Sequence, residues 1–383
     1  MKKICFITTT RADYGMVEIM VNEAQNYKKK YQIFLIISGN HNDNFFGKSI
    51  NEIKLKKKIK IYRVFSNQRN KNLSSVALSF SKFLKKFSHC LKKINPDVFI
   101  VFGDRYEMLS ATLSAFILGV PIVHLAGGEK TSGSLDDGFR HSITKLSNLH
   151  FPTSNIYKKR IIQLGEHPKT VFNFGSLNKQ KIANTNFFSK TKLEKKFKIK
   201  FLKKNILMTL HPENVPIKKN LENLKMLLEC LDILKNTRII ITSPNADAGG
   251  VEMINLIKNF IRKKNKFQFI KSFGSVGYLS MLRHIDGVIG NSSSGISEVP
   301  LFSIKSINLG NRQKGREINK SVISCKFNKK IILKSLKKLK KNNTLIKITK
   351  RDKLVAKKIL KKITKFNFKK KSYKEFKDLK FNI

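Results

Sequence analysis

Cysteine is scarce in this sequence: its 383 residues include only four, and each of them stands alone. Cys5, Cys90, Cys230 and Cys325 form no C-x-x-C pair, which argues against a zinc cage and against a disulfide framework. Thiols that are neither paired nor clustered are typical of a reducing compartment. We therefore expect a cytoplasmic protein without a metal site.

Long hydrophobic runs of the kind used for targeting are also missing. The apolar run Ile4–Ile7 that follows Met1-Lys2-Lys3 is too short for a signal peptide and has no small-residue cleavage site after it. Residues 108–126 carry no formal charge, but they include Pro121, His124 and several hydroxyl side chains. A buried helix followed by a buried strand explains them better than a membrane span, so no membrane partner is expected.

Acidic residues are few, with 25 Asp and Glu against 78 Lys and Arg, a formal net charge of +53. One interpretation is a protein that binds nucleic acid or an anionic surface. The other is a lysine-rich and asparagine-rich composition spread over every exposed surface. The lysines are dispersed and do not flank an aromatic stripe or a binding motif, so we favour the second interpretation and expect no nucleic-acid partner. Such a field would still attract a dianionic ligand.

Apolar residues make up 41% of the chain, including 29 Phe, which is enough for two cores and excludes a disordered chain. Strands and helices alternate along the first half, which predicts βαβ units and a parallel sheet. The strands expected are Lys3–Thr8, Gln32–Ser38, Asp97–Phe102, Val120–Leu125 and His150–Thr153. The helices expected are Met16–Tyr27, Leu73–Ile94, Glu107–Leu118 and Asp136–Ser147.

The same alternation begins again after a Lys- and Asn-rich stretch. It predicts strands at Asn205–Leu210, Arg238–Thr242, Phe267–Ile270, Val288–Ile289 and Ser306–Asn308, and helices at Asn220–Leu234 and Gly249–Lys263. We therefore expect an α/β protein with two Rossmann-like doubly wound domains that face a cleft. The expected boundaries are 1–178, a connection at 179–204, a second domain at 205–360 and a basic C-terminal helix or tail at 361–383. Ligands of such sheets lie beyond the carboxyl ends of the strands.

Charged side chains follow the strands of the first half. Arg11 lies in a strand-to-helix turn, where a cation beside free helix N–H groups suits a phosphate. That turn lacks G-x-G-x-x-G, which argues against a standard dinucleotide site. Asp104, Glu129 and Asp136 also lie in strand-end loops, and Arg140 can pair with Asp136 across one helical turn. One such carboxylate could simply cap a helix, but three together suit proton transfer at carbon.

The second half carries a different set of side chains in the same positions. His211, after one strand, is an acid or base candidate, and Asn245 follows the next strand. Ser292 and Ser293 lie in the run Gly290–Glu298, where small residues at a helix start can bind phosphate. Glu298 can accept hydrogen bonds from both hydroxyls of a ribose. Arg312, in the loop 308–316, offers a cation for a diphosphate.

These motifs together resemble the hydrolysing UDP-N-acetylglucosamine 2-epimerases. The resemblance is carried by RADYG (11–15), GDRYE (103–107), HLAGGE (124–129), SGSLDDGFRHSITKLSNLHF (132–151), SPNADAGG (243–250), GNSSSGISE (290–298) and NLGNRQKGR (308–316). It runs in order from the N-terminus to about residue 320. It implies the glycosyltransferase-B fold with the active site in the cleft, and a homodimer or homotetramer.

The resemblance also implies roles for single residues. Diphosphate ligands would be Arg11, Ser292, Ser293 and Arg312; Glu298 would hold the ribose; Arg105, His211 and Asn245 would line the nucleotide side. Catalytic and sugar-binding positions would be Asp104, Glu129, Asp136, Arg140 and His211. The implied chemistry is removal of the C2 proton, anti elimination of UDP and hydration of 2-acetamidoglucal to N-acetylmannosamine for sialic-acid-type sugar synthesis, with no cofactor.

The same sequence is compatible with other functions. The nearest alternative is the same reaction on UDP-2,4-diacetamido-2,4,6-trideoxyglucose, on the route to legionaminic acid. A non-hydrolysing epimerase would keep UDP on the product, although the GDRYE and LDDGFRH forms look more like the hydrolysing branch. A glycosyltransferase would need an acceptor. A non-enzymatic basic protein would bind nucleic acid in a salt-sensitive way that is independent of the cleft.

Overall fold

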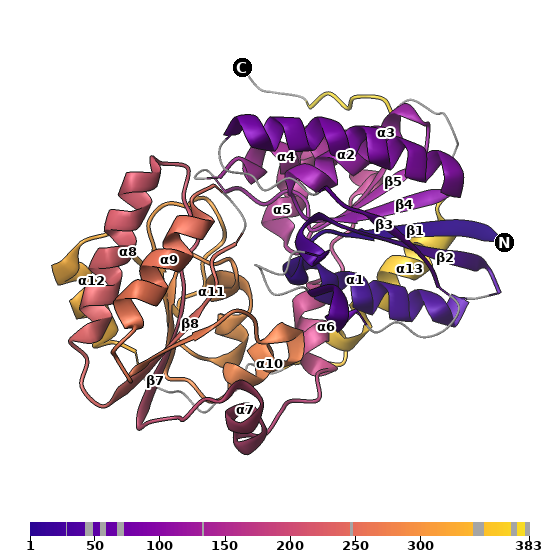
Figure 1. The fold of residues 1–383 in the computed structure, drawn as a ribbon. Coiled ribbons are helices and arrows are strands. Elements are labelled where there is room, and N and C mark those ends of the chain that lie inside the picture. Colours follow the sequence, from indigo (N-terminus) through magenta and orange to yellow (C-terminus); the bar gives the residue numbers. More distant parts are fainter. Residues whose placement is uncertain are drawn as a thin grey trace.

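Each half of the chain forms one parallel six-stranded sheet with helices on its faces, as the computed structural model shows (Figure 1). The structure describes residues 1–27, 29–42, 49–53, 59–66, 73–131, 134–245, 248–339, 348–368 and 374–379. The α/β architecture with two Rossmann-like domains that the sequence predicts is confirmed.

The first sheet has the order β3-β2-β1-β4-β5-β6, so the direction of winding reverses between β1 and β4. Side chains alternate across it: Ile4 and Phe6 face the core that contains α1 (Arg11–Ala24) and α13 (Val355–Lys365), while Cys5 and Ile7 face the core that contains α2 (Leu73–Ile94) and α3 (Tyr106–Ile117). Both faces are covered, which explains the nearly continuous apolar runs of its central strands. The strands are β1 (Lys2–Thr8), β2 (Tyr31–Ser38), β3 (Lys60–Val64), β4 (Val98–Phe102), β5 (Ile122–Leu125) and β6 (Leu149–Phe151).

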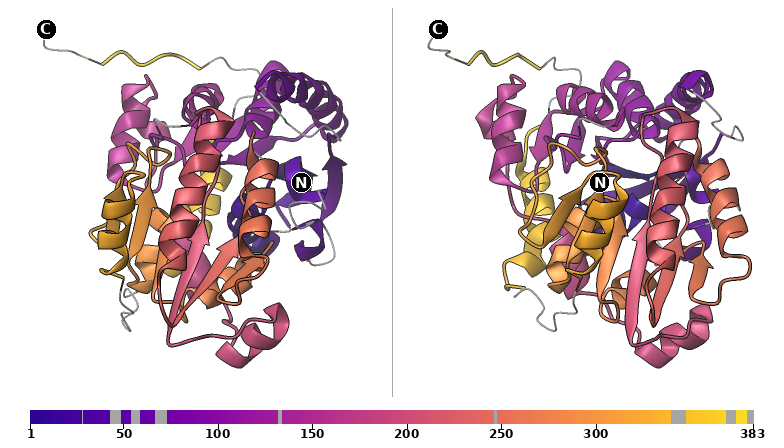
Figure 2. Two further views of the ribbon diagram at one scale, coloured as in Figure 1. Left: turned by 60° about the vertical axis from the view of Figure 1, so that its left-hand side comes forward. Right: turned by 90° about the vertical axis from the view of Figure 1, so that its left-hand side faces the viewer.

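The second sheet has the order β12-β11-β10-β7-β8-β9, the same winding repeated. Helices cover both of its faces as well (Figure 2). The strands are β7 (Lys204–Thr209), β8 (Thr237–Thr242), β9 (Phe267–Ile270), β10 (Gly287–Gly290), β11 (Ser306–Leu309) and β12 (Val322–Cys325). The carboxyl ends of both sheets point toward the region between the two halves, so the strand-end loops of one domain meet those of the other.

The helices of the first half are α1 (Arg11–Ala24), α2 (Leu73–Ile94), α3 (Tyr106–Ile117), α4 (Asp136–Leu146) and α5 (Asn155–Gln163). Those of the second half are α8 (Ile217–Asp232), α9 (Gly250–Ile261), α10 (Gly274–Met281), α11 (Ser294–Ser297) and α12 (Lys329–Leu336). Short 3-10 helices lie at Gln25–Tyr27, Gly39–Asn42, Ser49–Glu52, Pro168–Thr170, Val299–Phe302 and Asp352–Leu354. Over the described ranges, no helix is both long and apolar enough to cross a bilayer.

The connection between the domains and the C-terminal helix differ from the sequence expectation. The Lys-rich connection is helical in part, because it contains the end of α6 (Leu177–Ala183) and all of α7 (Lys190–Phe197). The helix α13 (Val355–Lys365) returns to the first domain, where Val355, Ile359 and Ile363 join the core beside α1 (Figure 1). The expected boundary at residue 360 therefore falls inside a helix whose packing belongs to the first domain. An amphipathic pattern indicates that a helix covers a core, but it does not indicate which core.

Candidate active site

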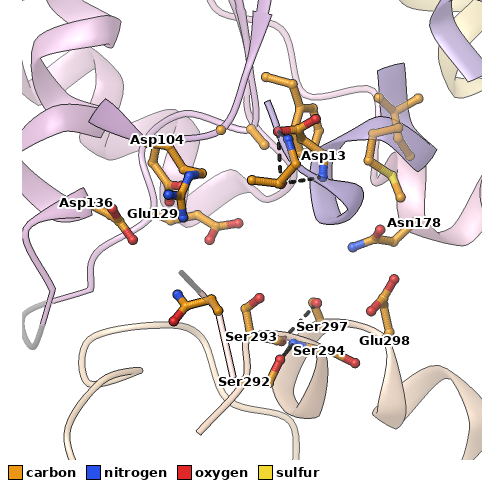
Figure 3. A pocket seen from close by; sticks show the side chains of 18 of the residues that line it. Asp13, Asp104, Glu129, Asp136, Asn178, Ser292, Ser293, Ser294, Ser297 and Glu298 are labelled. Atoms are coloured by element: carbon orange, nitrogen blue, oxygen red, sulfur yellow. Dashed lines mark hydrogen bonds between the residues drawn. The ribbon is translucent and has the colours of Figure 1, made fainter. Parts of the chain in front are cut away.

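A cavity of ≈ 430 Å³ lies between the two domains, at the carboxyl ends of both sheets. Eleven of the twelve residues singled out in the sequence line it: Asp104, Arg105, Glu129, Asp136, Arg140, His211, Asn245, Ser292, Ser293, Glu298 and Arg312. The twelfth, Arg11, begins α1 beside the cavity-lining Thr10, but the Arg11 side chain lies outside the described part of the chain. The three carboxylates of the first domain face the serine-rich loop of the second across this space (Figure 3).

Arg140 organises the carboxylate side of the cavity. Its side chain, on α4, is only 1% exposed and forms an ion pair with Asp104. One guanidinium nitrogen, Nη1, also donates to the Glu129 carbonyl oxygen and to Thr131 Oγ1, both at 3.0 Å, and to Asp137 Oδ1 at 3.4 Å. A buried guanidinium needs this many acceptors because each unpaired donor would cost free energy. The sequence predicts that Arg140 pairs with Asp136; in the structure Arg140 forms ion pairs with Asp104 and, within α4, with Asp137.

Asp104 is held in its ionised form. Burial alone would raise the pKa of its carboxyl, but Arg140, Arg316 and Arg105 oppose this and bring the pKa below its ordinary value. A carboxylate that stays ionised near neutral pH and faces a cavity can accept a proton from a bound molecule.

His124 supports the loop that carries Asp104. It is buried on β5, with Nε2 2.9 Å from the Gly103 carbonyl oxygen and Nδ1 3.1 Å from Thr144 Oγ1. Burial is the main reason that its pKa falls to about 3, so the ring is neutral at physiological pH. The ring therefore fixes the end of β4 without adding charge to the site.

Arg316 is a further member of this cluster of carboxylates and arginines, and the sequence did not predict it. Its Nη2 lies 2.9 Å from Glu129 Oε2 and 4.0 Å from Asp104 Oδ2. Four residues earlier, Arg312 Nη2 lies 4.0 Å from Asp136 Oδ2. The sequence predicts that Arg312, in the loop 308–316, offers a cation to a diphosphate. In the structure Arg312 and Arg316 of this loop both reach carboxylates of the other domain. The only sequence feature that could have indicated a shared role is that the two arginines are four residues apart.

His211 and Asn245 are held together on the nucleotide-side loops. The backbone N–H of Asn245 donates to His211 Nδ1 at 3.0 Å, so a neutral His211 ring carries its proton on Nε2. The His211 backbone is itself fixed by Asn291, whose side-chain oxygen accepts from its N–H at 2.7 Å and whose amide nitrogen donates to its carbonyl at 2.9 Å. Three strand-end loops are thus tied into one wall of the cavity.

The serine-rich loop starts at a glycine that no other residue could replace without a backbone shift. Gly290 has φ +142°, and a Cβ there would lie 1.8 Å from the Thr209 carbonyl oxygen of the neighbouring strand. The chain then turns into α11, with Ser292 and Ser293 directly before it. Ser294 N–H donates to Ser292 Oγ at 3.4 Å, and Ser297 Oγ donates to the Ser293 carbonyl at 3.0 Å.

Two further cavity residues were missed. Lys181, on α6, lies with its Nζ 3.9 Å from Glu298 Oε1, and it falls in the connection that the sequence predicts at residues 179–204. Asp13, on α1, caps the first turn of that helix and accepts hydrogen bonds from Thr8, Thr9 and Thr10. Its burial raises the pKa of its carboxyl despite those bonds. A capping box was recognisable in the sequence, whereas the pairing of Lys181 was not, since its partner is more than a hundred residues away.

Comparisons with known proteins identify relatives of this chain. The family model described as UDP-N-acetylglucosamine 2-epimerase matches residues 23–365. The chain is 39% identical over 331 residues to GDP/UDP-N,N'-diacetylbacillosamine 2-epimerase (hydrolyzing) of Campylobacter jejuni, with 85% of each chain covered. It is 35% identical to polysialic acid biosynthesis protein P7 of Escherichia coli, over 88% of this chain and 85% of that protein. It is 30% identical to UDP-N,N'-diacetylbacillosamine 2-epimerase (hydrolyzing) of Legionella pneumophila, over 88% of each.

The fold has a counterpart among solved structures. A UDP-GlcNAc 2-epimerase from Methanocaldococcus jannaschii, solved in complex with UDP-GlcNAc and UDP, superposes with a TM-score of 0.77. The superposition covers 94% of this chain and 99% of the other, at 19% sequence identity. At that identity the likeness concerns the arrangement of the two domains and not the details of the pocket.

Proposed function

The chain belongs to the UDP-N-acetylglucosamine 2-epimerase family, and from this we propose that it hydrolyses a UDP-activated 2-acetamido sugar with inversion at C2. The observation that carries the proposal is the meeting of two unlike groups of side chains across one cavity. Asp104, Glu129 and Asp136 come from the first domain, and the serine-rich loop with its arginines comes from the second. One group suits proton transfer at carbon, and the other suits a diphosphate.

The nucleotide end of the substrate would bind to the second domain. Ser292 and Ser293 offer hydroxyl and backbone donors to the phosphate oxygens, and Arg312 offers a cation. Glu298 would accept hydrogen bonds from the ribose hydroxyls. Because Lys181 lies 3.9 Å from that carboxylate, we expect it to contribute positive charge on the same side.

The sugar end would lie against the carboxylates. One carboxylate removes the proton from C2 while the bond between C1 and the diphosphate oxygen breaks, and the electron pair forms a C1=C2 double bond. Asp104, already ionised, is suited to accept that proton. The cations of the second domain stabilise the negative charge that develops on UDP. Water then adds at C1, and a proton is delivered to C2 from the face opposite to the one from which the first proton was removed. The products are the free sugar with inverted C2 and the UDP that was released in the elimination.

Apolar side chains border part of the cavity and can pack against methyl groups of a bound sugar. Met16, Phe102, Leu125, Phe151 and Leu177 line it, and all but Phe102 are buried. A 2,4-diacetamido-2,4,6-trideoxy sugar offers three methyl groups to such a wall, whereas N-acetylglucosamine offers one. Two of the similar proteins are named for N,N'-diacetylbacillosamine. We therefore place UDP-2,4-diacetamido-2,4,6-trideoxyglucose first as the substrate and UDP-N-acetylglucosamine, which the family description names, second.

The test is a direct comparison of the two UDP-sugars and of the GDP form of the diacetamido sugar. Each is incubated alone with purified protein, and free nucleotide and free sugar are followed by NMR. We expect nucleotide release from each UDP-sugar with a kcat/KM at least ~10-fold higher for the diacetamido substrate. A preference for UDP-N-acetylglucosamine would favour the second candidate. An epimer that keeps its nucleotide, or no turnover of any of the three, would contradict the proposed hydrolysis.

A further inference from the structure

The loop after β11 spans the two domains. In its own domain it is anchored by Glu213, whose Oε1 accepts the backbone N–H groups of Asn311 at 3.0 Å and Arg312 at 2.9 Å. Gly310, at φ +72°, makes this anchor possible, since a Cβ there would lie 2.4 Å from the same carboxylate oxygen. At its other end, the backbone N–H of Glu317 donates to the Tyr157 hydroxyl of the first domain at 3.1 Å. The residue directly before this contact is Arg316.

We propose that Arg316 is a positioning residue for the 2-epimerisation, which aligns Asp104 and Glu129 as one pair facing the sugar when the two domains close. Its guanidinium has carboxylate oxygens of both within 4.0 Å. The proposal rests on the proposed function, because only that reaction gives the pair a task.

Geometry supports this role over a role in binding the diphosphate. Asp104 and Glu129 follow different strands, and two carboxylates repel each other unless cations lie between them. Arg140 reaches the Asp104 side chain but only the backbone carbonyl of Glu129. Among the described residues, Arg316 forms ion pairs with the side chains of both carboxylates, and its own side chain is 13% exposed. Because it belongs to the second domain, the pair can be aligned only when the domains are together.

Because Asp104 is surrounded by charged groups, the effect of Arg316 on it can be measured from the pH dependence of the reaction rate. Arg140 approaches it from α4, Arg105 from its own loop, neutral His124 from β5 and Arg316 from the second domain, and Glu129 is paired with the same Arg316 nitrogen. Burial raises the pKa of Asp104, and these arginines together lower it below its ordinary value. Without Arg316, the pKa of Asp104 must rise, and the acid limb of the rate must move to higher pH.

The experiment compares Arg316→Ala and Arg316→Lys with a matched control, Lys314→Ala. Lys314 is an exposed cation of the same loop, so its removal changes the net charge equally. For Arg316→Ala we expect kcat to fall about 100-fold, since a small misplacement of catalytic groups has effects of that size. KM and the affinity for UDP should change by less than about threefold. Arg316→Lys should restore the position of the acid limb but only part of kcat.

A second measurement does not depend on turnover. Aspartate labelled with ¹³C at Cγ is titrated by NMR, and the Asp104 signal is identified by its loss in Asp104→Asn. Arg316→Ala should shift that titration to higher pH, and Lys314→Ala should leave it in place. If wild type releases nucleotide from no UDP-sugar, the proposed function fails, and this titration alone decides whether Arg316 acts on Asp104. An unchanged titration, an unchanged acid limb, or a loss of UDP affinity as large as the loss of kcat would overturn the proposal.

Discussion

Asp104 is the residue on which most of the cavity's positive charge converges. Replacing it with Asn keeps the shape of the side chain but removes the proton acceptor and the charge that balances Arg140. We expect Asp104→Asn to lower kcat by about 10²- to 10⁴-fold, the usual contribution of a positioned base, while UDP binds within about threefold of wild type. Steady-state kinetics and calorimetry measure the two effects. A variant that kept most of its kcat would exclude Asp104 from proton transfer.

Arg312 provides a separate test of the nucleotide side. Its backbone is fixed by Glu213 and its guanidinium lies near Asp136, so it is held at the cavity before any ligand binds. Arg312→Ala should weaken UDP binding by about 10- to 100-fold, the loss expected for a charge-assisted hydrogen bond. The control is again Lys314→Ala, which should bind UDP like wild type. Equal affinity in the two variants would show that the diphosphate lies elsewhere.

Among the structural elements, α4, β6 and residues 374–379 of the C-terminal segment are joined at one buried carboxylate, which follows α5. Glu166 is 1% exposed and accepts hydrogen bonds from Lys145 at 3.0 Å and from Lys374 at 2.7 Å, with His150 Nε2 3.0 Å away. Burial would raise its pKa, but His150 and Lys374 outweigh this and lower the pKa from its ordinary 4.5 to about 2. This junction lies at the end of α4, the helix that carries Asp136 and Arg140.

Glu166→Gln should therefore lower the free energy of unfolding at neutral pH by about 2–3 kcal/mol, because the partly buried Lys145 and Lys374 lose the carboxylate that they share. The carboxyl's pKa is lower in the folded state, so its stabilisation is present above pH 4.5 and is lost as the pH falls toward 2. The difference between variant and wild type should narrow over that range in denaturant titrations. Glu222→Gln, which removes an exposed partner of Lys219, is the control and should cost less than about 0.5 kcal/mol. A constant difference across that pH range would contradict the assignment.

The sequence predicted most central strands and helices, because buried parallel strands are short apolar runs flanked by turns. It did not predict β3, whose residues Lys60 to Val64 are mostly exposed and only partly apolar, nor α7, which is hidden in a lysine-rich stretch. Ligands of parallel α/β sheets bind beyond the carboxyl ends of the strands. Once the strands were predicted, the loops after them therefore indicated most of the candidate-site residues. The ion-pair partners of Arg316 and Lys181 could not be predicted. Each partner lies more than a hundred residues away in the sequence, and the side chains meet only after the two domains have folded.

The charge of the whole molecule has its own consequence. A net charge of +53 surrounds a cavity that we propose binds a dianionic nucleotide. We expect kcat/KM to fall several-fold between about 50 and about 500 mM NaCl, as the long-range attraction is screened, while kcat changes little. Uridine, which is uncharged, is the control ligand, and its affinity for the protein should not change with the NaCl concentration. If uridine and UDP responded alike, the field would have no part in capture.

The central claim is that the cleft between the two domains eliminates UDP across C1 and C2 and then hydrates the product. Running the reaction in D₂O and examining both products by NMR tests this most directly. The account predicts free UDP together with a free sugar whose C2 configuration is inverted and which carries deuterium from the solvent at C2. A released sugar that kept its original hydrogen at C2, or one with C2 not inverted, would contradict the account.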